Sequence, residues 1–141
     1  LAPGGILCLI DLDYNCLSHY AMPGSLETSL FGVMDALAGR ADFDPYVGRK
    51  LYSFLYDLEY SEIEVMLSAH HLIFGRLNRA DEYNWIKKVE IAAKNSGYPF
   101  DEYEDRFDGF LSEFKQYFSH PRRFTYTPLI ACRGRKAEAV L

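Results

Sequence analysis

The sequence predicts an α/β fold, with three layers (α/β/α) around a short and mainly parallel sheet. Two observations carry this prediction. Residues 6–10 form an uninterrupted apolar run, which is typical of a strand buried on both faces in a parallel sheet. Strand-like and helical patterns then alternate along the chain, with a helix-rich middle over residues 61–119, and this alternation favours a layered α/β architecture.

Composition and charge exclude several other classes of protein. The chain has 141 residues, of which 49% are hydrophobic and 25% charged, and its formal net charge is −5. No apolar run reaches the ~20 residues needed to span a bilayer, so we expect no membrane segment. The cysteines Cys8, Cys16 and Cys132 form no Cys-x-x-Cys pair, which favours reduced thiols and a cytoplasmic protein.

One domain over residues 1–141 is the economical organisation, because no repeat or linker interrupts the chain. A domain of about 150 residues buries roughly 68–70% of its unfolded surface, so a chain of this length can form its own core. Because the chain begins with Leu1 rather than methionine, we expect it to be either a processed product or an excerpt of a longer protein.

The first half of the chain predicts a strand, a helix and a second strand. After the apolar run at residues 6–10, Ser25 can cap a helix that ends at Gly39. Residues 51–58 are rich in Tyr, Phe and Leu, which favours a strand. This strand would present three aromatic side chains on one face, those of Tyr52, Phe54 and Tyr56.

The middle of the chain predicts two helices. Ser61-x-x-Glu64 matches a capping box, and apolar residues follow it at helical spacing as far as Phe74. Asp81 can cap the next helix, which ends at Gly97.

The last third predicts one more helix and a strand. Asp101 can cap a helix whose apolar stripe consists of Phe107, Phe110, Leu111, Phe114 and Phe118. Residues 124–132 alternate as a strand does, and Pro128 within them indicates an edge or a bulge.

Two carboxylates, Asp11 and Asp13, come at the carboxyl end of the first strand, with Asn15 close behind. In open α/β sheets, ligands bind at that edge. Carboxylate oxygens are the hard ligands that Mg²⁺ and Mn²⁺ prefer. The pattern therefore predicts a Mg²⁺ or Mn²⁺ site. The alternative is that Asp11 and Asp13 only end the strand and cap a turn.

The end of the chain is basic, although the average charge is negative. Residues 122–141 hold five basic side chains and one acid, a net charge of +4, whereas residues 1–121 carry −9. Such a segment can hold a phosphate backbone beside a metal site. Its candidate residues are Arg133, Arg135 and Lys136, in a basic loop that enters a helix with Glu138 in its first turn. The alternative is a solvated basic segment, with Glu138 favoured by the helix dipole alone.

Together these segments resemble the NYN branch of the PIN-like nucleases. The strand that ends at Asp11, the aromatic residues 49–57 and the late segment 135–141 follow the family's order, and Gly97-Tyr98 stands where the family has a glycine–aromatic turn. The sequence departs from the family in the spacing of Asn15, in Glu138 for an aspartate and in Arg135 for a lysine.

The resemblance implies a metal-dependent ribonuclease that acts on RNA phosphodiesters with Mg²⁺ or Mn²⁺. It implies that the catalytic and metal-binding carboxylates are Asp11, Asp13 and Glu138. It further implies that the substrate is held by Asn15, Arg133, Arg135 and Lys136.

Other hypotheses remain open. Asp11-Leu12-Asp13 also resembles the first motif of haloacid-dehalogenase-like phosphatases, in which Asp11 would be the nucleophile and Asp13 the general acid. The same strand resembles the opening of GGDEF-like palm domains, but residues 47–51 lack that family's glycine pair and acids, which leaves only a degenerate, noncatalytic version as an alternative. From a different class, a noncatalytic domain could bind a protein partner or a second copy through the aromatic helix predicted at residues 107–118.

Overall fold

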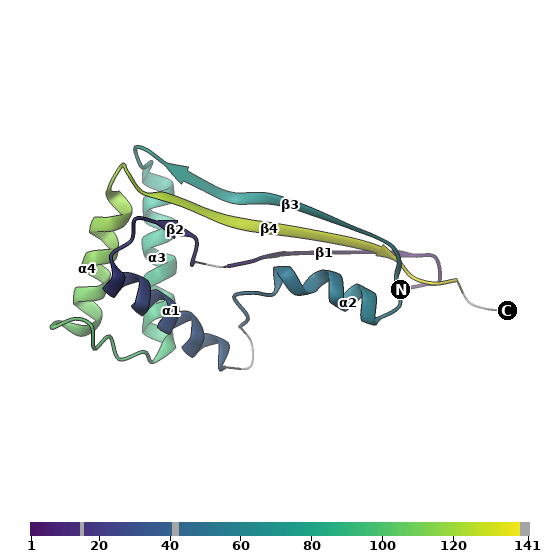
Figure 1. Ribbon diagram of the computed structural model, residues 1–141, viewed down its shortest axis with the longest axis horizontal. Coiled ribbons are helices and arrows are strands. Elements are labelled where there is room, and N and C mark those ends of the chain that lie inside the picture. Colours follow the sequence, from purple (N-terminus) through teal and green to yellow (C-terminus); the bar gives the residue numbers. More distant parts are fainter. Residues whose placement is uncertain (15, 41–42, 139–141) are drawn as a thin grey trace. The chain divides into compact units, whose positions relative to one another are not determined.

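The structure, a computed structural model, describes residues 1–14, 16–40 and 43–138, which form two compact units (Figure 1). Unit 1 is drawn from Leu1–Asn15, Tyr46–His70 and Thr127–Leu141, and unit 2 from Cys16–Pro45 and His71–Tyr126. The expectation of a single domain over residues 1–141 stays a prediction.

The sheet is antiparallel, so the prediction of a mainly parallel sheet is wrong. It is formed by β1 (Ile6–Leu12), β2 (His19–Tyr20), β3 (Ser61–Phe74) and β4 (Phe124–Arg135). Strand β4 pairs with each of the other three. It runs back along β1 in a register that places Ile6 opposite Arg135 and Leu12 opposite Leu129. The strand that neighbours β1 is thus the returning end of the chain, not a strand delivered by a helical crossover.

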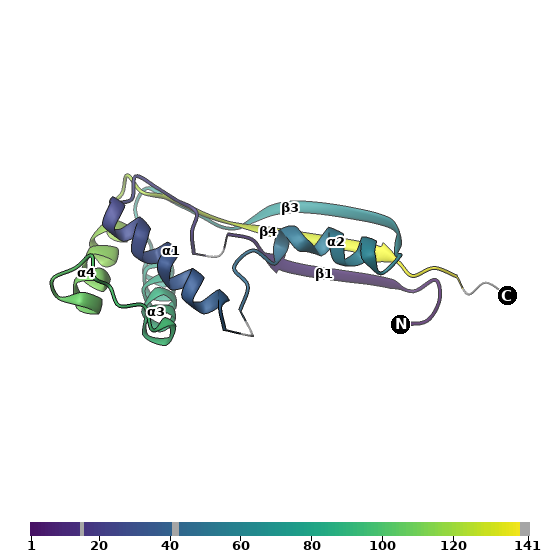
Figure 2. The same cartoon turned by 60° about the horizontal axis from the view of Figure 1, so that its bottom comes forward.

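In unit 1 one short helix covers one face of the sheet. The 3₁₀ turn η1 (Gly48–Lys50) leads into α2 (Leu51–Asp57), whose Leu51 and Leu55 pack against Cys132. Figure 2 shows α2 lying over β4 between β1 and β3. The strand predicted over residues 51–58 is therefore a helix, because the two leucines four residues apart form its buried side.

The helix predicted from Ser61 to Phe74 is also wrong, since these residues form β3. The Ser61-x-x-Glu64 pattern overlaps the segment Glu62-Ile63-Glu64-Val65, in which charged and apolar side chains alternate with the two-residue period of a strand. Ile63 points into the core under α2, whereas Glu62 and Glu64 pair with arginines of β4.

Unit 2 contains the three helices that the sequence predicts most directly: α1 (Gly24–Ala38), α3 (Arg79–Ser96) and α4 (Arg106–Ser119). Asn78 rather than Asp81 caps α3, and Gly97 ends it with a φ of 73°. The aromatic stripe of α4 lies inside this unit, because Phe110, Phe114 and Phe118 are fully buried. They are not available to a partner in this structure.

Strand β4 confirms the predicted strand at residues 124–132 and extends it to Arg135. The basic segment is therefore mostly strand, and no helix follows it in the described residues up to Glu138. Along β4 the buried residues are odd-numbered up to Thr127 and even-numbered from Cys132 onward. The buried side of the strand thus changes around Pro128, as it does at a bulge. Over the described parts of the chain, no helix is long and apolar enough to cross a membrane.

Candidate functional site

The carboxyl end of β1 carries the first two predicted site residues. Asp11 is exposed, and its Oδ1 accepts a hydrogen bond of 2.7 Å from the backbone N–H of Leu12. Asp13 is only 7% exposed, and its backbone N–H donates to the carbonyl of Pro128 at 3.0 Å. Asp11 thus lies within β1 and Asp13 comes directly after it, and each carboxylate already accepts hydrogen bonds from this chain.

The carboxylate of Asp13 is paired with Arg49. Arg49 Nε donates to Oδ1 at 2.9 Å and Nη2 donates to Oδ2 at 2.8 Å, a bidentate pair. This hydrogen bonding raises the pKa of Arg49 above its ordinary value. The guanidinium carbon also lies 4.9 Å from the ring centroids of both Tyr14 and Tyr46. The arrangement secures η1 against the end of β1, which is what a structural clamp does.

Gly48 allows this close approach, and we expect Gly48→Ala to destabilise the protein by about 1–3 kcal/mol. A Cβ at Gly48 would lie 2.8 Å from the carbonyl oxygen of Leu12 and 3.0 Å from Cβ of Asp13. The free energy of unfolding in urea measures the effect. Gly24→Ala is the control, because a Cβ there meets no atom within 4 Å. Equal unfolding midpoints for the two variants would contradict the clamp.

Glu138 lies at the other end of the β1–β4 pair from Asp11. Its carboxylate packs against Gly4, 2.7 Å from the position that a Cβ on Gly4 would occupy. Gly4 precedes β1, and Asp11 is five residues beyond Ile6, the first residue of that strand, a span of about 17 Å at ~3.3 Å per residue. The structure therefore does not bring Glu138 together with Asp11 and Asp13.

The basic residues proposed to hold a phosphate backbone bind groups of unit 1. Arg133 forms a bidentate pair with Glu64, its Nη2 lying 2.7 Å from Oε1, and this bond lowers the pKa of Glu64. Arg135 donates to Glu62 at 3.0 Å and to the carbonyl of Gly4 at 2.9 Å. Lys136 donates to the carbonyl of Leu1 at 2.9 Å. Each of these basic side chains thus donates at least one hydrogen bond to a group of its own unit.

No three His, Cys, Asp or Glu residues of the described chain gather to hold a metal ion. Asn15, the remaining residue of the predicted set, lies outside the described residues. The metal site and the ribonuclease activity stay predictions, and the geometry directs attention to another part of unit 1.

That other part is the face of the sheet opposite α2. Alternation along β1 places Leu7 and Leu9 under α2 and turns Ile6, Cys8 and Ile10 to the other side. Ile6 is 53% exposed and Ile10 is 60% exposed. Cys8 is exposed and forms no disulfide with another described cysteine. Sequence reasoning placed these side chains in a buried strand, whereas the described chain leaves them uncovered.

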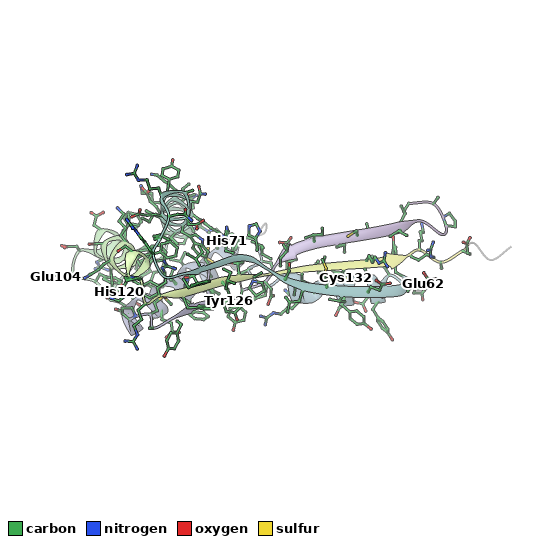
Figure 3. All side chains as sticks on the ribbon, turned by 90° about the horizontal axis from the view of Figure 1, so that it is seen from above. Glu62, His71, Glu104, His120, Tyr126 and Cys132 are labelled. Carbon is green, nitrogen blue, oxygen red and sulfur yellow. The ribbon has the colours of Figure 1, made fainter. Side chains whose placement is uncertain are left out.

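The open face continues across β4 onto β3. A shallow cavity of about 220 Å³ on it is lined by Cys8, Met66, Ala131 and Arg133, among others. Met66 of β3 is 62% exposed. Figure 3 shows the strands of this unit edge to edge, with Cys132 and Glu62 labelled. Apolar side chains from three strands thus share a surface, here called the open face, with the Arg133–Glu64 and Arg135–Glu62 pairs, since Arg133 lies opposite Cys8 and Arg135 lies opposite Ile6.

The outer edge of β1 pairs with no other strand among the described residues. In an antiparallel pair, residues whose N–H and C=O groups face the neighbouring strand alternate with residues whose groups point away. The bond from Asp13 to Pro128 and the bond from Lys136 N–H to the carbonyl of Gly5 assign the odd-numbered residues to β4. The backbone groups of Cys8 and Ile10 therefore point outward, and β1 has β4 as its one partner among the described strands.

Comparison with known proteins adds no assignment, since no family model and no curated protein matches the chain.

Proposed function

We propose that this chain is a protein-interaction module that binds a partner polypeptide by strand addition at the outer edge of β1, with the open face packing against the same partner. The observation that carries the proposal is the mismatch between β1 and its surroundings. Ile6-Leu7-Cys8-Leu9-Ile10 contains no charge and no proline, as expected of a strand covered on both faces and paired on both edges. The described chain supplies one neighbouring strand and one covering layer.

The other outer strand of unit 1 supports the choice of β1. Strand β3 carries Glu62 and Glu64 near its start, and charged side chains on an edge oppose pairing with another chain. Strand β1 lacks such protection until Asp11, whose carboxylate satisfies the outward N–H of Leu12. The part of the β1 edge without a charged side chain thus ends at Asp11, whose own carboxylate bonds the next outward N–H. An edge of this kind is suited to β-augmentation, in which a partner adds a strand to the sheet.

The test uses two variants of β1. Cys8→Pro removes an outward N–H, and edge positions of this kind tolerate proline. Ile10→Asp places a charge on the open face. Any second copy offers the same edge, so self-association in concentrated solution substitutes for the partner. In sedimentation velocity from low to high micromolar concentration, we expect the parent chain to associate and each variant to associate about tenfold more weakly.

Ile91→Asp is the matched control, because Ile91 is 57% exposed on α3 in unit 2. We expect this variant to associate like the parent. A second probe is a soluble fluorescent peptide of alternating Val and Thr between lysines, which is an extended strand without a fold of its own. A parent chain that stays monomeric and does not bind this peptide overturns the proposal, as does association that Ile10→Asp and Ile91→Asp weaken equally.

A further inference from the structure

A separate cavity lies within unit 2, where α4 ends and the chain turns into β4. Its volume is about 350 Å³, within the ~300–1,000 Å³ typical of small-molecule sites. Figure 3 labels His120, which follows the last residue of α4. The polar residues that line the cavity are Glu113, Gln116, Tyr117, His120, Arg122 and Arg123.

Arg123 is a buried cation whose hydrogen bonds all go to neutral groups. It is 2% exposed. Its Nε donates to the carbonyl of Phe118 at 2.7 Å and its Nη2 to the carbonyl of Gly75 at 3.0 Å. Its Nη1 has no hydrogen-bond partner in the described structure. The guanidinium carbon also lies 5.1 Å from the centroid of the Phe118 ring. These contacts hold the side chain in place, but they leave Nη1 without a hydrogen-bond acceptor and supply no anion to pair with the charge.

Buried charges in proteins are paired, because an isolated ion loses its hydration without compensation. No carboxylate of the described residues lies within ion-pair distance of Arg123. Asp81 is near enough to raise its pKa, but burial is the larger influence and lowers that pKa overall. A guanidinium in this state indicates an anion that comes from outside the chain.

Two further donors belong to the same turn. Arg122 is exposed and lines the same cavity as Arg123. The backbone N–H of Arg122 donates to His120 Nδ1 at 3.1 Å, so the neutral imidazole carries its proton on Nε2 and offers that nitrogen as a donor. The one lining acid, Glu113, already accepts from Ser25 at 3.0 Å and from Tyr103 at 2.6 Å.

We propose that this cavity binds the oxyanion group of a small molecule, a carboxylate or a phosphate, through the guanidinium groups of Arg122 and Arg123. Planar guanidinium groups recognise both kinds of oxyanion in bidentate geometry. The site lies wholly within unit 2, so its test is independent of strand addition at β1.

Titrations with acetate and, separately, with inorganic phosphate at low ionic strength test the proposal and distinguish the two chemistries. The readout is the NMR signal of the arginine Nε–H groups in the whole chain. We expect one of the two anions to shift the Arg123 signal saturably with millimolar affinity. Arg122→Gln should weaken that binding about tenfold and leave the fold intact, because Arg122 is exposed.

Lys115→Gln is the control, since Lys115 is an exposed cation on α4 and does not line the cavity. This change removes the same unit of charge and should alter the affinity less than twofold. The proposal is overturned if neither anion moves the Arg123 signal, or if Lys115→Gln and Arg122→Gln weaken binding to the same extent.

Discussion

Phe114→Ala is expected to lower the free energy of unfolding by about 3–5 kcal/mol, the largest effect of any substitution considered. Phe114 is fully buried on α4, its ring stacked on that of Phe118 with centroids 5.5 Å apart and its edge near His19. Truncation leaves a cavity between helices and strand that this small core cannot close. Equilibrium unfolding in urea measures the loss.

Tyr83→Ala is the control, because Tyr83 is 65% exposed on α3 and its removal should change the free energy of unfolding by less than about 0.5 kcal/mol. The comparison also separates the two roles that the sequence allows for the aromatic stripe. A Phe114→Ala chain that unfolds like the parent but loses self-association would show that the stripe is a partner surface. Loss of stability assigns it to the core.

The helices of unit 2 could be predicted from sequence because their signals are local. The spacing of Leu26, Leu30 and Val33 sets the buried side of α1, and Gly97 ends α3. Residues 51–57 and 61–74, for which the sequence prediction is wrong, each carry two conflicting local signals. In residues 51–57 the aromatic side chains favoured a strand, yet the leucine pair decides the structure. In residues 61–74 a capping pattern outweighed the alternation that the strand follows.

The order of strands in the sheet and the partners of the acidic side chains depend on residues far apart in the sequence. No local sequence pattern could therefore predict them. The antiparallel pairing of β4 with β1 joins residues from opposite ends of the chain, with Ile6 opposite Arg135. Asp13 was correctly placed at the end of β1, but its partner Arg49 is 36 residues away in sequence. Arg123 contributed to the basic charge of the last segment, whereas its burial and its unpaired Nη1 emerge only from the packing of Phe118 and Gly75.

The apolar run of β1 is the case in which the sequence prediction and the structure disagree most usefully. The composition of residues 6–10 predicts coverage on both faces, and the described chain covers one. A local pattern reports the environment for which a segment is suited, which includes neighbours beyond the described residues. The disagreement is therefore the physical basis for proposing a partner at β1.

Acidification from about pH 6.5 to pH 4 is expected to remove about 3 kcal/mol of stability through one buried histidine, His19. Burial lowers the pKa of His19 to about 4, from an ordinary value of 6.5, and the charges of Arg123 and Lys88 add to this effect. Its Nε2 donates to the carbonyl of Cys16 at 3.0 Å and its Nδ1 accepts from the hydroxyl of Thr125 at 2.8 Å, which suits a neutral ring.

The sign follows from where the proton binds. Between pH 6.5 and 4 the unfolded chain protonates His19 while the folded chain does not, so the unfolded state binds more protons and stability falls as the pH falls. Above pH 6.5 the ring is neutral in both states, and its contribution is fully present. Below pH 4 both states are protonated, and no further loss comes from this group.

His19→Gln isolates this contribution, because the amide nitrogen can still donate to the carbonyl of Cys16 but does not titrate. Carboxylates such as Glu102, whose hydrogen bond with Tyr98 lowers its pKa, lose their contribution equally in both proteins. Urea unfolding at closely spaced pH values should therefore show the parent losing about 3 kcal/mol more than the variant between pH 6.5 and 4. His120→Gln, at an exposed position, should follow the parent. Parallel curves of unfolding free energy against pH for the parent and His19→Gln would contradict this prediction. They would mean that the folded protein does not keep the His19 imidazole neutral, as its hydrogen bonds with Cys16 and Thr125 require.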